Sequence, residues 1–265
     1  MKKLMAVLCA AGMILALSGC SKKAEKGEFT VEKGKLMIAM EVGYPPFEYY
    51  ADDGKTPMGF DVELGKEVAK RLGLEPVFID TAWDGIFAGL DTDRYDTVMS
   101  AATITPERVQ NYTFSQPYIG NGQAIILQKD STLSIKEFSD LAGLKVGYQA
   151  ETTSDFYTKK HSEGWTYVEN AYDKVMNAYD DLKLKRIDAV VSDSLVAVDY
   201  LAKPNSEFKQ VWAAEPDEYF GVCMKKGNTA LQAKIDQAIN EMKADGTLKN
   251  IYIKIFGMDL SDSIK

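Results

Sequence analysis

The stretch SAATITPERVQNYTFSQPY, residues 100–118, combines a strand end, a polar loop and a helix start. Small and hydroxyl-bearing residues open it, Pro106 and Glu107 favour a first helical turn, and Arg108 falls within that turn. Hydroxyl groups, free backbone N–H groups and a guanidinium all bind anions. The stretch therefore predicts a seat for a carboxylate or a phosphate. The alternative is an ordinary helix cap beside a solvated arginine.

Short apolar segments alternate with amphipathic ones on both sides of this stretch, which is typical of mostly parallel sheets covered by helices. The pattern starts again after residue 143, so we expect an α/β fold of two lobes. Predicted strands are residues 36–40, 76–79, 97–99, 144–148, 166–169 and 187–191, and predicted helices are 61–72, 84–90, 152–161, 172–184 and 193–202, followed by tail helices that begin after Asn228 and at Thr247.

Two continuous apolar runs, QAIILQ at residues 123–128 and YFGVCM at 219–224, bracket the second half of the chain. We interpret them as two crossings between the lobes, so that the tail completes the first lobe. The predicted boundaries are residues 34–122 and 220–265 for the first lobe and residues 123–219 for the second.

The first 19 residues have the pattern of a secretory signal peptide. Lys2 and Lys3 precede an apolar run of 14 residues, Leu4–Leu17, which is too short to span a membrane. The next tetrad, Leu-Ser-Gly-Cys, resembles a bacterial lipobox, in which Cys20 would carry lipid. An ordinary cleaved signal with an incidental cysteine is the alternative. Residues 20–33 are polar and predict a flexible tether.

Charge and motif content argue against several classes of protein. Removing Lys2 and Lys3 takes the formal net charge from −8 to −10, and such acidity without a basic run disfavours nucleic acid as a partner. The single histidine, His161, is expected at the end of a helix, and no nucleophile elbow, phosphate loop or zinc spacing occurs. We therefore expect no catalytic residue, metal or cofactor.

Asp52-Asp53-Gly54 predicts a hairpin turn, with a calcium loop as the alternative.

Binding groups gather where predicted strands end, the edge at which open α/β sheets bind ligands. In the first half these are Glu41, Tyr44, Trp83 and the loop from Thr103 to Arg108. In the second half they are Thr152, Thr153 and Ser154 at a helix start, and Asp193 after a strand. The alternatives are core packing for the aromatic residues and a plain helix cap for Asp193.

Seven segments carry a resemblance that covers essentially the whole chain after the tether. They are MEVGYPPFEYY, GFDVELGKEVAKRLG, WDGIFAGL, YDTVMSAATITPERVQNYTFSQPY, LAGLKVGYQAETTSDFY, RIDAVVSDSLVAVDYL and DGTLKNIYIKIFG. In this order they resemble the polar amino-acid family of solute-binding proteins of ABC importers. The resemblance implies a type II periplasmic-binding-protein-like fold, in which two αβ lobes joined by two hinge strands close on a ligand.

The resemblance also implies roles for single residues. Arg108 would bind the α-carboxylate of an amino acid beside the hydroxyl of Thr103, and Asp193 would bind the α-ammonium. A backbone carbonyl at Ser100 or Ala101 would assist Asp193. The remaining expected contacts are Tyr44 and Trp83 as an aromatic pair around the side chain, Glu41 at its far end, and Thr152 and Thr153 at the helix start that closes onto the carboxylate.

One departure from the family pattern is Glu151, where members often have glycine. It places an acidic side chain near the expected carboxylate seat, where it would point to solvent or tune closing. The resemblance further implies a monomeric, extracytoplasmic protein that delivers its ligand to permease subunits. Lipid on Cys20 would hold it at the outer face of the cell membrane, in the periplasm if the host has two membranes.

Glu41, Tyr44 and Trp83 together predict a slot with a negative end, which suits arginine or lysine. Glutamine or cystine is the alternative, with Glu41 as a hydrogen-bond acceptor. A dehydratase that acts on arogenate or prephenate uses the same fold, with Glu41 or Glu151 as a possible acid. A sensory lobe of a receptor is the third alternative.

Overall fold

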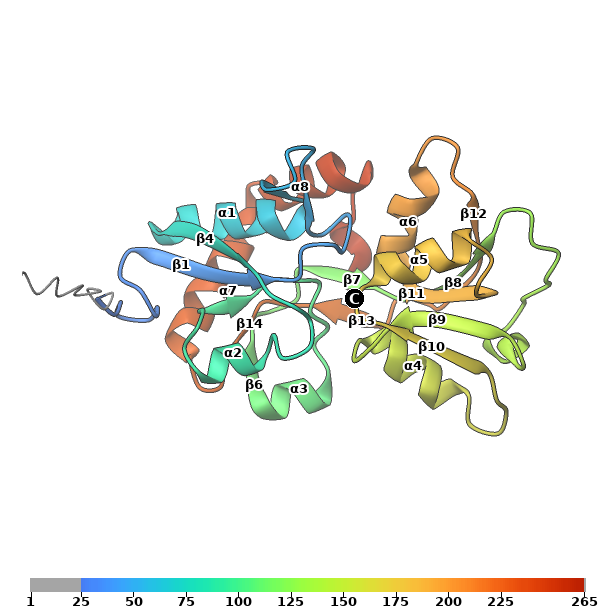
Figure 1. The fold of residues 1–265 in the computed structure, drawn as a ribbon. Coiled ribbons are helices and arrows are strands. Elements are labelled where there is room, and N and C mark those ends of the chain that lie inside the picture. The colour runs from blue at the N-terminus through green and yellow to red at the C-terminus, as the bar shows by residue number, and fades with distance from the viewer. Residues whose placement is uncertain (1–24, 265) are drawn as a thin grey trace, which may run out of the picture.

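The computed structural model describes residues 25–264, so the predicted signal peptide and Cys20 lie outside the described residues. Two lobes lie side by side along the long axis of the molecule (Figure 1). Each contains one five-stranded sheet with helices packed on it. The predicted two-lobed α/β fold is therefore confirmed.

The first sheet has the strand order β4-β1-β5-β14-β6. β4, β1 and β5 pair in parallel, and β14 pairs antiparallel with both β5 and β6. The strands are β1 (Lys35–Met40), β4 (Glu75–Asp80), β5 (Thr97–Val98), β6 (Tyr112–Phe114) and β14 (Cys223–Lys225), and the helices are α1 (Phe60–Leu72), α2 (Ala88–Asp91), α3 (Pro106–Asn111), α7 (Thr229–Ala244) and α8 (Thr247–Phe256).

The second sheet repeats this plan in the order β10-β9-β11-β8-β12. β10, β9 and β11 pair in parallel, and β8 pairs antiparallel with both β11 and β12. The strands are β8 (Gln123–Gln128), β9 (Lys145–Gln149), β10 (Val168–Tyr172), β11 (Ala189–Asp193) and β12 (Phe208–Ala213), and the helices are η1 (Phe138–Leu141), α4 (Thr153–His161), α5 (Val175–Lys183) and α6 (Ser194–Ala202). The last short helix, η2 (Ser261–Ser263), follows α8 of the first lobe.

The chain crosses between the sheets on the antiparallel strands β7 (Ile119–Asn121) and β13 (Glu218–Phe220). The interpretation of residues 123–128 as a crossing is therefore wrong. They form β8, whose six residues are all buried between β11 and β12 in the second sheet. A continuous apolar run fits a strand covered on both faces as well as it fits a hinge. Of the run 219–224, only its first part belongs to β13, and its end enters β14.

Local signals place most element ends. Gly73 ends α1 in the left-handed conformation with φ 68°, and the Asn228 side chain accepts a hydrogen bond from the Leu231 N–H at the start of α7. The helix expected at residues 84–90 is shorter and later, because Gly85 at φ 80° interrupts it before α2. The strand expected at residues 166–169 is displaced to β10.

The predicted hairpin is present between β2 (Tyr49–Tyr50) and β3 (Pro57–Met58). Asp53 accepts hydrogen bonds from the backbone of Lys55 and Thr56 and from the Thr56 hydroxyl, so its carboxylate serves the turn. Within residues 25–264, acidic, histidine and cysteine side chains form no cluster that could hold a metal ion. The turn interpretation therefore accounts for this acidic segment.

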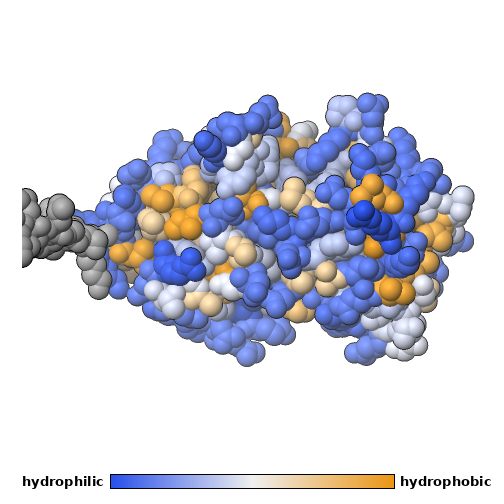
Figure 2. Space-filling model, in the orientation of Figure 1, coloured by the Kyte–Doolittle hydropathy of each residue, from blue (hydrophilic) through white to orange (hydrophobic). Residues whose placement is uncertain are grey.

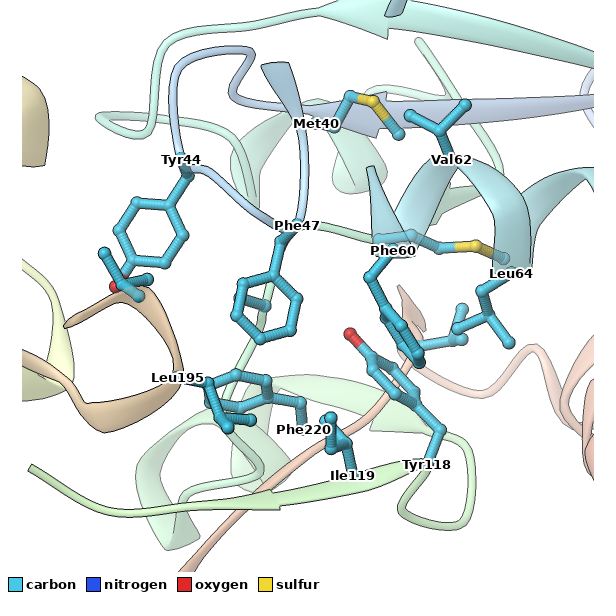
Figure 3. Close-up of a cluster of buried hydrophobic side chains, with 14 of the residues drawn as sticks. Met40, Tyr44, Phe47, Phe60, Val62, Leu64, Tyr118, Ile119, Leu195 and Phe220 are labelled. Carbon is cyan, nitrogen blue, oxygen red and sulfur yellow. The ribbon is translucent and has the colours of Figure 1, made fainter. Parts of the chain in front are cut away.

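An aromatic cluster forms the core of the first lobe. The Phe47 ring lies 6.0 Å from that of Phe60 and 5.4 Å from that of Phe220, in edge contacts that Figure 3 shows. Phe256 of the tail helix α8 completes the cluster, 5.6 Å from Phe47.

The face seen in Figure 2 is mostly hydrophilic, with small separate apolar patches. Every helix within residues 25–264 is too short or too polar to span a bilayer.

Candidate functional site

A small, partly enclosed cavity lies between the lobes. The structure brings all ten residues of the predicted site to its wall, together with Gln149, which the sequence did not single out. The lining residues are Glu41, Tyr44, Trp83, Ser100, Ala101, Thr103, Arg108, Gln149, Thr152, Thr153 and Asp193. Their place is thus known, and their roles in binding stay predictions.

Arg108 is positioned by the short helix α3, where Thr105 caps the first turn by accepting a hydrogen bond from the Arg108 N–H. Its guanidinium donates to the Thr103 carbonyl at 3.0 Å and lies 5.2 Å from the Trp83 ring centroid. Phe87 lies on it at 4.9 Å, a contact that sequence reasoning missed. The guanidinium therefore lies near two aromatic rings that are in edge contact with each other, and within residues 25–264 its remaining N–H groups make no hydrogen bond and can bind an anion.

Asp193 ends β11 and occupies the cap position of α6, yet its side chain makes no capping bond within the described residues. Its Oδ2 accepts from the Tyr44 hydroxyl at 2.5 Å, and its Oδ1 accepts from Asn121 Nδ2 at 2.8 Å and Gln123 Nε2 at 2.9 Å. The helix-cap alternative is therefore wrong. Burial raises the pKa of this carboxyl, although the three hydrogen bonds and the charge of Arg108 oppose that shift.

The two aromatic residues of the predicted pair also connect the lobes through their polar atoms. Tyr44 of the first lobe reaches Asp193, and Trp83 Nε1 donates to the Glu151 carbonyl at 3.1 Å. Both side chains are more than nine-tenths buried. Their rings form part of the cavity wall while their hydrogen-bonding groups hold the second lobe.

Ser100 and Ala101 are both held by hydrogen bonds within the first lobe. The Ser100 hydroxyl accepts from the Glu41 N–H at 3.0 Å and donates to Glu48 at 2.6 Å. Ala101 has φ 46°, an uncommon conformation for a residue with a side chain, and its N–H donates to Asp61 at 2.6 Å. Buried carboxyls therefore hold this segment of the wall.

The start of α4 provides the second-lobe side of the cavity. Thr152 donates to the Gln149 carbonyl at 2.7 Å, so its hydroxyl closes the preceding turn. The Thr153 hydroxyl lies 3.4 Å from that of Thr103 across the cleft and donates to Glu218 at 3.2 Å. The two lobes thus meet through these threonines beside Arg108.

Glu41 also lines the cavity and is 3% exposed. Its Oε2 accepts from Gln149 Nε2 at 2.6 Å, and burial raises the pKa of its carboxyl while the Lys174 ammonium opposes that rise. Lys174 itself donates to the Val42 carbonyl at 2.9 Å, across the cleft. The surroundings of Glu41 therefore include an amide from Gln149 and the nearby cation Lys174, and neither of these was predicted.

Glu218 on the crossing strand β13 is an acidic residue near the site that sequence reasoning missed. It accepts from Gln123 Nε2 at 3.1 Å, and that amide also serves Asp193. Burial and the charge of Asp193 raise the pKa of Glu218 to about 7. In the acidic run EPDEYF no sequence signal distinguishes it from its exposed neighbours.

Glu151 occupies a left-handed backbone conformation with φ 60°, which glycine adopts without steric cost. Its side chain is exposed and its N–H donates to Asp155. We expect Glu151→Gly to raise the free energy of unfolding by about 1 kcal/mol, because glycine carries no penalty in this conformation. Urea unfolding measures the change.

The matched control for that prediction is Glu163→Gly, at an exposed glutamate with an ordinary φ. It should lower the stability, because glycine there adds only freedom to the unfolded chain. Equal effects of the two substitutions would contradict the strain at Glu151.

Residues 36–258 match the model of the bacterial extracellular solute-binding proteins, family 3. The chain belongs to this family. Its members are extracytoplasmic binding proteins, which confirms the family resemblance seen in the sequence. The L-cystine-binding protein TcyJ of Escherichia coli (strain K12) is a 37% identical relative of this family 3 protein over 230 residues, covering 87% of this chain and 85% of TcyJ.

Solved structures agree with this assignment. An ancestral arginine-binding protein bound to arginine superposes with a TM-score of 0.81 at 39% identity, covering 85% of this chain and 99% of its own. An ancestral amino acid-binding protein described as a precursor of cyclohexadienyl dehydratase superposes with a TM-score of 0.77 at 35% identity, covering 84% and 95%. TcyJ is named for cystine and the first of these structures is bound to arginine, so these relatives do not agree on one ligand.

Proposed function

We propose that this family 3 protein captures one polar L-amino acid between its lobes and delivers it to the permease subunits of an ABC importer. The observation that carries the proposal is that Arg108 of the first lobe and Asp193 of the second line the same buried cavity. An amino acid presents an anion and a cation a few ångströms apart, so one molecule contacts both lobes at once. Closure then follows because the ligand makes its full set of contacts only in the closed state.

The expected contacts supply enough free energy. Hydrogen bonds to charged groups contribute about 1.5 to 3 kcal/mol each, and micromolar binding needs about 8 kcal/mol. In this proposal Arg108 and Thr103 bind the α-carboxylate with the α4 start at Thr152 and Thr153. Asp193 binds the α-ammonium with a carbonyl of Ser100 or Ala101, while Tyr44 and Trp83 flank the side chain.

We propose a cationic side chain, such as that of arginine or lysine, directed at Glu41. Support comes from the buried carboxylate and from a 39% identical structure bound to arginine. Lys174 favours a second candidate, because a cation near Glu41 opposes a cationic ligand. Cystine ends in both an ammonium and a carboxylate, which suits Glu41 and Lys174 together, and the relative TcyJ is named for cystine.

Calorimetry with the twenty amino acids and cystine distinguishes these ligands. We expect micromolar or tighter binding of arginine or lysine, and a loss of at least about tenfold in Glu41→Gln, because the charged end of the slot is removed. The matched control Glu75→Gln changes an exposed glutamate of the same lobe and should leave the affinity unchanged. Tight cystine or glutamine with no arginine or lysine binding would refute the cationic ligand.

We also propose that the ligand leaves chemically unchanged and that the protein is not an enzyme. The Arg108 and Asp193 pair suits a whole amino acid, whereas a dehydratase on this fold would use Glu41 or Glu151 as an acid. Incubation with arogenate and prephenate tests this alternative. Formation of phenylalanine or phenylpyruvate above the uncatalysed rate would contradict the proposal.

The cellular setting that we propose is a monomer anchored outside the cell membrane through lipid on Cys20, without nucleic acid or cofactor. Residues 34–122 with 220–265, and residues 123–219, would be its two lobes. Metabolic labelling with a fatty acid in parent and Cys20→Ser protein tests the anchor. Label on both proteins, or on neither, would contradict it.

A further inference from the structure

Two carboxyl groups lie buried behind the cavity wall, outside the predicted site. Glu48 follows Phe47 and Asp61 follows Phe60, and these rings meet in the aromatic core (Figure 3). Both acidic side chains are 0% exposed. Neither forms an ion pair with a basic side chain in the described part of the chain. Two uncompensated carboxylates at this depth would carry a large desolvation cost.

Each carboxyl uses one oxygen to hold the cavity wall. Glu48 Oε1 accepts from the Ser100 hydroxyl at 2.6 Å, and Asp61 Oδ2 accepts from the Ala101 N–H at 2.6 Å. The Ser100 hydroxyl in turn accepts from the Glu41 N–H. The pair thus supports the two residues expected to offer a carbonyl to the ligand ammonium, and the backbone of the residue expected at its far end.

The other two oxygens, Glu48 Oε2 and Asp61 Oδ1, are buried and have no hydrogen-bond partner within residues 25–264. The two carboxyls are close enough to interact with each other, and the Tyr118 hydroxyl is the nearest side-chain donor to Asp61. Two ionised oxygens cannot stay in contact, whereas a carboxylic acid donates well to a carboxylate. We propose that Glu48 and Asp61 share one proton and that the resulting pair is a positioning device for Ser100 and Ala101.

The surroundings of the pair agree with this proposal. Burial is the largest cause that raises the pKa of both carboxyls, that of Asp61 to about 7. The titratable groups that face them are Glu41, Tyr44 and Tyr118, and the Tyr118 hydroxyl lies within reach of Asp61. None of these groups brings a positive charge, so a proton is the available compensation.

The pair makes a prediction about stability and pH. The folded protein keeps the shared proton at a pH where unfolded glutamate and aspartate have lost theirs, so raising the pH favours the unfolded state. Between pH 5 and 7 we expect the unfolding constant of the parent to rise by up to about tenfold per pH unit more than that of Glu48→Gln. The parent is compared with Glu48→Gln because Asp96 and Glu218, which are present in both proteins, also titrate in this range.

Glu48→Gln is the conservative variant, because its amide donates to Asp61 in place of the proton and still accepts from Ser100. The exposed Glu75→Gln is the control and should keep the pH slope of the parent. The infrared difference spectrum between parent and Glu48→Gln at pH 7 should contain the carbonyl band of a protonated carboxyl. A parent with neither the extra slope nor the band overturns the shared proton.

The positioning role, which rests on the proposed function, is measured with L-arginine and L-cystine as calorimetric probes. Glu48→Gln should keep the affinity within about threefold, whereas Glu48→Ala should lose about tenfold or more because Ser100 loses its acceptor. If Glu48→Ala does not fold, Ser100→Ala tests the same link and should show a similar loss.

Two negative results remain distinguishable. A parent that binds neither probe contradicts the proposed ligands, while the pH slope and the infrared band still decide the shared proton. A parent that binds, with Glu48→Ala or Ser100→Ala binding equally well, overturns the positioning role.

Discussion

Arg108→Ala is expected to weaken amino-acid binding by at least about 100-fold while the protein remains folded. Loss of the guanidinium removes a paired, charge-assisted contact to the α-carboxylate, and such contacts contribute about 1.5 to 3 kcal/mol each. The fold should survive because Arg108 lies near the rings of Trp83 and Phe87, which also contact each other, and donates within the described residues only to the Thr103 carbonyl. Calorimetry gives the affinity and thermal unfolding gives the stability.

Arg108→Lys is the matched variant for this prediction, because it keeps the positive charge but loses the planar fork and the stacking. We expect an affinity between those of the parent and of Arg108→Ala. The neighbouring Arg94→Ala changes an exposed arginine of the same lobe and serves as control. If Arg108→Ala binds as tightly as the parent, the carboxylate seat lies elsewhere.

Asp193→Asn is expected to lower the affinity by a similar factor without lowering the stability of the ligand-free protein. Asparagine still accepts from Tyr44, Asn121 or Gln123 through its carbonyl, but it offers no negative charge to an ammonium. Because burial raises the pKa of Asp193, the carboxylate costs the folded state stability above its unfolded pKa, and the neutral amide removes that cost.

The raised pKa of Asp193 also predicts how the stability of the protein changes with pH. A carboxyl with a raised folded pKa takes up a proton on folding, so its contribution to stability falls as the pH rises from its unfolded toward its folded pKa. Asp193→Asn should show a smaller loss of stability over that window than the parent. Asp180→Asn, at an exposed position of the second lobe, is the control. A large loss of stability in Asp193→Asn would show instead that Asp193 is mainly a structural residue.

Much of the fold could be predicted because its signals are local. The alternation of apolar strands with amphipathic helices predicted both lobes, and Gly73 and Asn228 placed helix ends through their own backbone and side-chain chemistry. The crossings were harder, because β8 is as apolar as a hinge strand. Whether such a run is covered by neighbouring strands or links two sheets depends on pairing partners that are far away in sequence.

The candidate site divides in the same way. Arg108 and Asp193 follow strands in segments rich in binding groups, so the local sequence makes them candidates, and the family resemblance selects them. Phe87, Gln149 and Glu218 could not be selected in this way, because each reaches the site through contacts with residues from 21 to 108 positions away. A phenylalanine, a glutamine or a glutamate in a polar segment has many ordinary explanations.

The sequence by itself determined the family, the two-lobed fold and ten of the eleven residues that line the cavity, since these depend on local patterns and on motifs within single segments. Tertiary structure alone decided which oppositely charged groups face each other across the lobes. It also decided which carboxyls are buried away from solvent. Electrostatic energies depend on distance and burial, and neither is a property of one segment: Lys174 acts on Glu41, and Glu48 meets Asp61, only once the chain has folded.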